Sequence, residues 1–235
     1  MKLRVIGCAG PYPGAGRPTS SYLLESGDRL ILLDMGSGAL AALTLVTDPA
    51  GLDAVCVSHM HWDHMCDLLP WQYLLEKRGV RMPVYFPPEE ETSGRLTLFG
   101  PALDRRFLPD DGFVGGLRVI TAPTKHPMPN RAMRFTDGEK VIVYTGDAAE
   151  PGALRPLCEG ADILLADGAF LDKDYSSAAP HMSAGMAGIL AAECGVGQLV
   201  LTHLPPHTPD SVLLREAREA FRQTVLAEPG LCVTC

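Results

Sequence analysis

The stretch Ser58-His59-Met60-His61-Trp62-Asp63-His64 decides how this chain is interpreted. It directly follows the apolar run 53–57, which predicts a strand that delivers these side chains to one rim of a sheet. Side chains two apart on an extended backbone share a side, so His59 and His61 can bind one ion. Asp63 and His64, at the turn into the next helix, can reach a neighbouring ion. Imidazole and carboxylate suit zinc, manganese or iron better than calcium or magnesium. A solvated, histidine-rich turn is the alternative, and the four fixed positions behind a strand disfavour it.

Composition indicates one globular domain over residues 1–235, with a large apolar core. Apolar residues make up 46% of the chain, and 20 Lys and Arg against 28 Asp and Glu give a formal charge of −8. Long nucleic acid is therefore disfavoured as a partner, because a phosphate backbone requires clustered Lys and Arg and no basic run is present. A small phosphate ester stays open, since bound metal ions would supply local positive charge.

Cysteine usage and hydropathy favour a soluble, cytoplasmic protein. The seven cysteines are irregularly spaced, and the opening MKLRVIGCAG predicts a strand rather than a signal peptide. No apolar stretch approaches the roughly 20 residues of a membrane span. Cys232 and Cys235 form a C-x-x-C pair that could bind metal or undergo redox chemistry, but we expect a fraying tail there.

The order of predicted elements indicates an α/β fold in which two sheets pack together with helices outside. Asp137-Gly138 predicts a hairpin turn, Gly195 a helix C-cap, and the segment 89–108 stays undefined apart from an optional helix or lid. We expect strands at 2–8, 20–25, 29–34, 54–58, 82–86, 117–122, 131–135, 140–144, 161–166 and 198–202, and helices at 38–46, 67–78, 183–194 and 210–226.

Four further residues of ligand type follow apolar strands. They are His126, Asp147, Asp167 and His203. A single histidine beyond a strand is more often structural. Several such strand ends, in a chain that already contains the histidine motif, favour one shared site.

The order of these pieces resembles the metallo-β-lactamase-fold hydrolases, and the resemblance spans nearly the whole chain. The matching pieces are Leu33-Asp34-Met35-Gly36, the H-x-H-x-D-H motif, His126, Tyr144-Thr145-Gly146-Asp147 and Leu201-Thr202-His203. The resemblance implies a four-layer αββα sandwich of two mixed sheets with outer helices, with two divalent metal ions at one edge. Zinc is expected, with manganese or iron as alternatives.

The resemblance also implies the role of each residue. One ion would be held by His59, His61 and His126, the other by Asp63, His64 and His203, with Asp147 bridging and Asp34 supporting the metal loop from behind the ligands. Two ions roughly 4 Å apart can share a hydroxide that is nucleophilic at neutral pH, which makes Asp63 catalytic as well as a ligand.

The piece Pro180-His181-Met182-Ser183 resembles the histidine loop of the ribonuclease Z-like branch. In that branch the histidine donates a proton to the leaving oxygen and is held by an upstream acid. Asp167 matches the acid, although ribonuclease Z has the longer glutamate there. A helix-capping or surface histidine is the alternative for His181. A general acid suits phosphodiester cleavage, because an alkoxide is a poor leaving group.

We therefore expect a phosphodiesterase that acts on a small, cyclic-nucleotide-type diester, similar to bacterial cyclic-nucleotide phosphodiesterase-like members. A ribonuclease Z-like nuclease, a lactone or thioester hydrolase and a non-catalytic metal-binding module are the alternatives. Homodimerisation is an expectation by analogy only. Trp62 could stack on a base or pack against the next helix; the 10–18 loop could contact phosphate; His207 could rim the site.

Overall fold

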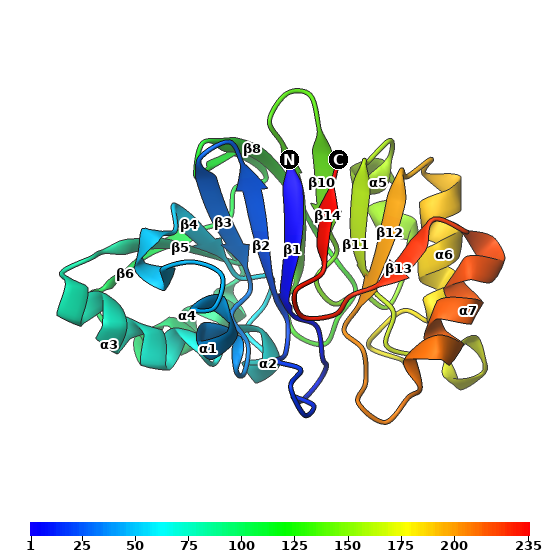
Figure 1. The fold of residues 1–235 in the computed structure, drawn as a ribbon, viewed down its shortest axis with the longest axis horizontal. Coiled ribbons are helices and arrows are strands. Elements are labelled where there is room, and N and C mark those ends of the chain that lie inside the picture. The colour runs from blue at the N-terminus through cyan, green and yellow to red at the C-terminus, as the bar shows by residue number, and fades with distance from the viewer.

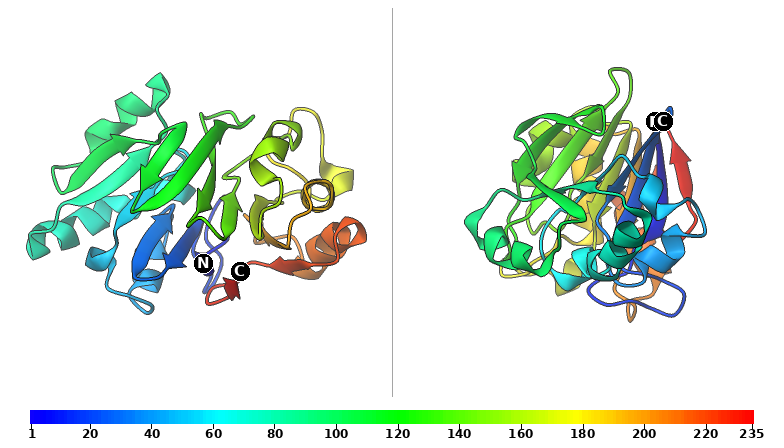
Figure 2. Two further views of the ribbon diagram at one scale, coloured as in Figure 1. Left: turned by 90° about the horizontal axis from the view of Figure 1, so that it is seen from above. Right: turned by 90° about the vertical axis from the view of Figure 1, so that its left-hand side faces the viewer.

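The computed structural model describes residues 1–235 and shows two seven-stranded mixed sheets with helices on their outer faces (Figures 1 and 2). This arrangement confirms the expected αββα sandwich. The α-helices are α1 (Ala39–Leu43), α2 (Trp62–Met65), α3 (Leu68–Arg78), α4 (Glu90–Arg95), α5 (Arg155–Cys158), α6 (Ala184–Glu193) and α7 (Asp210–Ala220), and the short 3₁₀ turns are η1 (Pro49–Gly51), η2 (Leu96–Leu98), η3 (Gly152–Leu154) and η4 (Asp172–Asp174).

The first sheet is built almost entirely from the first half of the chain. Its order is β14-β1-β2-β3-β4-β5-β6, antiparallel from β14 to β3 and parallel from β3 to β6. Its strands are β1 (Lys2–Gly7), β2 (Ser21–Ser26), β3 (Arg29–Leu33), β4 (Ala54–Cys56), β5 (Met82–Phe86), β6 (Leu103–Phe107) and β14 (Cys232–Thr234).

The second sheet repeats this design. Its order is β13-β12-β11-β10-β9-β8-β7, parallel from β13 to β10 and antiparallel from β10 to β7. Its strands are β7 (Asp111–Val114), β8 (Leu117–Pro123), β9 (Arg131–Thr136), β10 (Val141–Tyr144), β11 (Ile163–Asp167), β12 (Gln198–Thr202) and β13 (Thr224–Leu226). The predicted hairpin at Asp137-Gly138 joins β9 to β10, with Val141 opposite Thr136.

Three apolar layers hold the four structural layers together. Between the sheets, alternate residues such as Leu24 and Leu165 form a cluster of 23 buried residues. Their strand neighbours Leu23 and Leu164 point the opposite way, into clusters beneath α1 and α3 and beneath α5 to α7. Strands that are buried on both faces require unbroken apolar runs, which is why these segments show little polar alternation.

Several expected boundaries are wrong at the end of the chain. The last helix ends at Ala220 rather than 226, because Thr224–Leu226 pairs with β12 as strand β13. The expected fraying tail is instead β14, which pairs with β1. It brings the two termini together, and the backbone N–H of Cys235 donates to the carbonyl of Met1 at 3.1 Å (Figure 1).

The undefined segment 89–108 contains α4 and the edge strand β6, and β7 was not predicted. Elsewhere the expected elements are present with shifts at their ends: strand 54–58 ends at Cys56, and helix 38–46 shortens to Ala39–Leu43. Helix α6 has Ser183 as its N-cap and Gly195 at a φ of 60° just past its end, as the sequence predicts. No helix is both long and apolar enough to span a bilayer.

Candidate metal centre

The residues of ligand type converge because their strands end at the same edge of the sandwich. β3 and β4 run parallel in the first sheet, and β10, β11 and β12 run parallel in the second. The carboxyl ends of parallel strands meet at one edge, where α/β proteins bind their ligands. His59 follows β4, His126 follows β8, Asp147 follows β10 and His203 follows β12, while Asp167 ends β11. Segments 144 residues apart in the chain therefore share one site.

The first group consists of His59, His61, His126 and Asp147, whose nearest ligand atoms all lie within 4.8 Å of one another. The Nδ1 atom of His61 lies 2.9 Å from Nε2 of His59 and 3.1 Å from Nε2 of His126. Nδ1 of His126 lies 3.0 Å from the carbonyl oxygen of Pro180, which fixes its ring. Three imidazole nitrogens facing one point form the donor set that the sequence predicts for one ion.

The second group consists of Asp63, His64 and His203, and Asp147 lies between the two groups. Oδ1 of Asp147 is 3.4 Å from Nε2 of His64 and 3.4 Å from Nδ1 of His203. Oδ2 of the same carboxylate is 3.5 Å from Nε2 of His59. One carboxylate thus presents one oxygen to each group, which is the geometry of a bridging ligand.

Unpartnered polar atoms test whether metal ions fit this site. Four buried side-chain atoms without a hydrogen-bond partner lie here: Asp63 Oδ2, His64 Nε2, Asp147 Oδ1 and His203 Nε2. A buried polar atom without a partner is destabilising by roughly 1–3 kcal/mol, so a cluster of four requires an explanation. Divalent cations would satisfy all four, and the nitrogen and oxygen donors suit zinc, manganese or iron.

Burial and charge set the protonation of the imidazoles. Burial lowers the pKa of His61 to about 4, helped by the neighbouring His126, and burial also holds the pKa of His59 well below its usual range. Both rings are therefore neutral at pH 7, the form that binds metal. Burial opposes ionisation of Asp147, but the neighbouring His203 and His64 hold the pKa of this carboxyl well below its usual range.

Asp34 anchors the metal loop from behind. Its Oδ1 accepts the backbone N–H of Ser58 at 2.6 Å, and its Oδ2 accepts the hydroxyls of Ser58 and Tyr144, each at 2.7 Å. Oδ2 also lies 2.7 Å from Nδ1 of His64, which leaves Nε2 of that ring to face the site. Ser58 and Tyr144 lie inside the quoted motifs, yet the motifs themselves predict no role for either residue. An apolar strand that ends in a tyrosine was the available signal.

Backbone geometry around the second group is equally restrictive. Asp34 and His203 are the two non-glycine residues with positive φ, at 59° and 58°. Gly36 packs against the backbone carbonyl of Asp63 and the hydroxyl of Thr19, so a β-carbon at 36 would overlap both. Gly10 likewise packs against the imidazole of His203. The glycine of the Leu33–Gly36 motif is thus explained by close approach rather than by a turn.

His181 and Asp167 form a pair beside the two groups. Nδ1 of His181 lies 2.8 Å from Oδ2 of Asp167, so the shorter acid does reach the imidazole. Burial opposes protonation of His181, yet the charge of Asp167 and its hydrogen bond raise the pKa of this imidazole to about 9. The His181 ring stacks on that of His203, with centroids 4.7 Å apart. Ser183, not His181, caps α6.

Two positions left open by the sequence are now placed. Trp62 is 54% exposed at the rim of the metal cavity, and the guanidinium of Arg95 on α4 lies 5.6 Å from its ring centroid. His207 is exposed, and its Nδ1 lies 3.4 Å from Oη of Tyr12. Cys232 and Cys235 have free thiols and belong to none of the ligand groups.

Asn130 was missed entirely. Its amide donates to the carbonyl of Thr145 at 3.0 Å and accepts the backbone N–H of Asp147 at 3.3 Å, which fixes the loop that presents the bridging carboxylate. No sequence pattern pointed to it.

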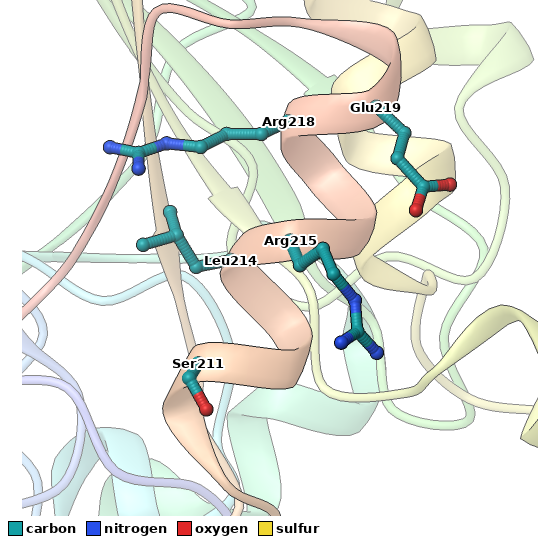
Figure 3. A pocket seen from close by; sticks show the side chains of 5 residues that line it. All are labelled: Ser211, Leu214, Arg215, Arg218 and Glu219. Carbon is teal, nitrogen blue, oxygen red and sulfur yellow. The ribbon is translucent and has the colours of Figure 1, made fainter.

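A separate hollow on the outer face of α7 is lined by that helix alone, with Arg215 and Arg218 among its residues, and contains no group from the metal edge (Figure 3).

Comparison with known proteins places this geometry in a family. Residues 29–204 match the model of the beta-lactamase superfamily domain. The chain belongs to the beta-lactamase superfamily. Its relatives include the probable metallo-hydrolase YhfI of Bacillus subtilis (strain 168), which is 36% identical over 98% of both chains. The crystal structure of YhfI superposes with a TM-score of 0.93 at 34% identity, covering 99% of this chain and 98% of YhfI.

Two further relatives are more distant. The uncharacterized protein ML1173 of Mycobacterium leprae (strain TN) is 30% identical over 94% of this chain and 84% of its own. A ribonuclease Z of Mycobacterium sp. (strain KMS) is 29% identical over 99% of this chain and 98% of its own. The family and the metallo-β-lactamase fold are therefore established together.

Proposed function

We propose that this chain is a metal-dependent hydrolase that cleaves a small phosphodiester of the cyclic-nucleotide type. The observation that most favours it is the His181–Asp167 pair, 2.8 Å apart, placed beside two groups of metal-ligand type. A site of this kind combines cation binding with a positioned proton donor. The relative named a probable metallo-hydrolase supports metal-dependent hydrolysis, and only the relative named a ribonuclease Z supports a phosphodiester as the substrate class.

The ligand roles that we propose divide the site into two halves. Two divalent ions, when bound, supply a water of lowered pKa and neutralise negative charge on the attacked group. The chain's own part is to hold them: His59, His61 and His126 on one side, Asp63, His64 and His203 on the other, and Asp147 between. Asp34 keeps Nδ1 of His64 occupied and so directs Nε2 towards the site. The proposed catalytic part of Asp63 is exerted through the ion that it holds.

His181 is proposed as the general acid. The hydrogen bond to Asp167 occupies Nδ1, and Nε2 has no protein partner, so Nε2 is the nitrogen available to a leaving oxygen. As the bond between phosphorus and that oxygen breaks, the oxygen takes the proton from Nε2. Asp167 is fully buried and orients the ring. General-acid assistance of this kind contributes about 100- to 10,000-fold when the leaving group is a poor one.

A polynucleotide substrate is less well supported. The formal charge is −8, and the cations near the site are already engaged: Arg95 donates to the carbonyl of Met60, and Lys125 pairs with Glu150. A surface that grips a phosphate backbone needs unpaired Lys and Arg in a row. A small diester whose charge is met by the two cations needs none.

Leaving-group dependence tests this proposal. We expect the His181→Ala variant to retain two ions per chain but to have a kcat about 100-fold or more lower on a cyclic mononucleotide or alkyl diester. Its loss on a nitrophenyl diester should be only a few-fold, because nitrophenolate departs without a proton. The nitrophenyl substrate is the internal control, since the same variant and metal content serve both assays. Equal losses on both substrates would remove the general-acid role, and turnover of lactones or thioesters alone would overturn the phosphodiesterase.

A further inference from the structure

A second cavity adjoins the one at the metal groups and is lined in part by the same residues. It has a volume of about 430 Å³, close to the 440 Å³ of the cavity that contains His61, Asp63, His126 and Asp147. The two cavities share Pro11, Pro180, His181 and His203, which form the wall between them. Beyond that wall, the second cavity is lined by residues to which neither the ligand set nor the acid pair assigns a role, including Phe170, Leu171, Asp174, Pro205 and Thr208.

Phe170 is the distinctive group in this second cavity. Its ring centroid lies 5.9 Å from that of His181, which in turn stacks on His203, so three rings lead outward from the metal groups. Phe170 belongs to none of the three core clusters, whereas its neighbour Leu171 packs against the cluster beneath the second sheet. A large aromatic side chain that the core does not use, half-buried in a cavity, is available to a ligand.

The backbone holds Phe170 in a fixed position. Its N–H donates to the carbonyl of Met182 at 3.3 Å, and its carbonyl accepts the N–H of Ala184 at 2.8 Å. These bonds pair Phe170 with Ser183, two positions after His181, and so tie the backbone of Phe170 to the segment that carries the imidazole. A binding surface built on such a support keeps its geometry relative to the proton donor.

The opposite wall is formed by two loops that are tied together. The N–H of Gly10 donates to the carbonyl of Leu204 at 3.3 Å, and the guanidinium of Arg17 pairs with Asp210 at 3.1 Å. The 10–18 loop is therefore tied to the loop after β12, and Gly10 and Pro11 line the second cavity.

We propose that this second cavity receives the leaving-group side of the diester, with a nucleobase stacked on Phe170. The assignment rests on the proposed function, because Nε2 of His181 must lie next to the leaving oxygen and the group on that oxygen must then extend past His181. Phe170 offers an aromatic face there, and base–aromatic stacking tolerates any base. The exposed carboxylate of Asp174 disfavours a second phosphate at the cavity and can accept a hydrogen bond from an amino or hydroxyl group.

Trp62 offers the competing platform. It lies at the rim of the metal cavity, on the other side of the wall formed by His181, and the Arg95 guanidinium is positioned over its ring. A base stacked on Trp62 would place the nucleoside on the cation side instead. A base on Phe170 predicts that only Phe170→Ala weakens nucleoside binding, whereas a base on Trp62 predicts that only Trp62→Ala does.

Binding of adenosine to the metal-loaded protein decides between them without turnover. We expect Phe170→Ala to bind adenosine about tenfold more weakly than wild type, with Phe170→Tyr within about twofold and Trp62→Ala unchanged. Methyl riboside, which lacks the base, should bind all four proteins alike. Phe113→Ala, which removes a phenyl ring that is 70% exposed on β7, controls for loss of a surface aromatic residue. Equal adenosine affinity for Phe170→Ala and wild type overturns the proposal, as does a loss in Trp62→Ala alone.

Turnover then separates this inference from the function on which it rests. With adenosine 3′,5′-cyclic phosphate and the corresponding base-free ribose cyclic phosphate as substrates, Phe170→Ala should lower kcat/KM about tenfold on the first only. If wild type hydrolyses neither substrate while adenosine binding still depends on Phe170, the phosphodiesterase fails and the base site stands. If wild type hydrolyses both substrates and Phe170→Ala lowers kcat/KM equally on both, the proposed base site is refuted and the proposed phosphodiesterase activity is retained. Melting temperatures of all variants show that each is folded.

Discussion

Replacing Asp34 by asparagine tests how far the metal site depends on a residue that contacts no ion. The carboxylate is fully buried and accepts from three groups, the backbone N–H of Ser58 and the hydroxyls of Ser58 and Tyr144, and it also contacts Nδ1 of His64. An amide places an NH₂ group against at least one of these donors, whichever way it turns. Asparagine tolerates the positive φ of this position, so the backbone adds little strain.

The expected loss of stability follows from these bonds. A hydrogen bond to a buried charged group contributes about 1.5–3 kcal/mol, and a donor left unpaired costs a similar amount. We expect Asp34→Asn to lower the free energy of unfolding by about 3 kcal/mol, an estimate that allows for partial repacking. In a chain of this size that corresponds to a melting temperature roughly 6–12 °C lower.

The effect on metal binding should be confined to one half of the site. Without the carboxylate, the His64 imidazole can rotate or shift its proton to Nε2, which removes that nitrogen as a ligand. Loss of such a supporting partner typically lowers metal affinity about 10- to 100-fold. Competition with a chromogenic chelator should therefore show one weakened ion, while the ion at His59, His61 and His126 keeps its affinity.

Tyr144→Phe is the matched control for this prediction. It removes one donor to Asp34 but leaves the carboxylate and its contact with His64. Its stability should fall by about 1 kcal/mol with both affinities preserved. An Asp34→Asn protein that is destabilised yet binds two ions with wild-type affinity would refute the reasoning, because Asp34 would then only support the core.

Three further predictions concern the loops and the sheet edges. Gly10→Ala should lower the affinity for the ion at His203 by about tenfold with little change in melting temperature, because a methyl group at position 10 would overlap the imidazole of His203. Chelator competition measures this affinity, and an unchanged value would contradict the prediction. Burial opposes ionisation of Glu25, but hydrogen bonds from two cations on β1 hold the pKa of this carboxyl below its ordinary 4.5. The free energy of unfolding measured in urea at pH 7 should therefore be about 0.5–1 kcal/mol higher for wild type than for Glu25→Gln. This difference should shrink as the pH falls below 4.5 and through the lower pKa of the folded state, because the carboxylate becomes protonated. A difference that grows in acid would contradict the prediction. Truncation after Gly230 removes β14 and its buried valine and should lower stability by about 2–4 kcal/mol, whereas a tail without structural role would cost nothing.

The sequence by itself determined which residues of ligand type gather at one edge, and the layer arrangement. His59 to His64 follow an apolar strand, and residues placed just past strands can meet only where parallel strands end together. Apolar runs such as 163–166 specify strands buried on both faces, which requires helices outside two sheets. These properties are local, so a linear pattern records them.

Only the tertiary structure decided which groups support the ligands and what lies beyond them. The hydrogen bond from Tyr144 to Asp34 joins residues 110 positions apart, and the local sequence around either residue does not predict the other as its partner. The pairing of β14 with β1 overrides a segment whose own sequence predicts no strand, because its partner lies at the opposite end of the chain. Phe170 resembles any core phenylalanine until packing shows that the core excludes it. Contacts between distant segments depend on the geometry of the whole fold, and a pattern along the chain does not encode that geometry.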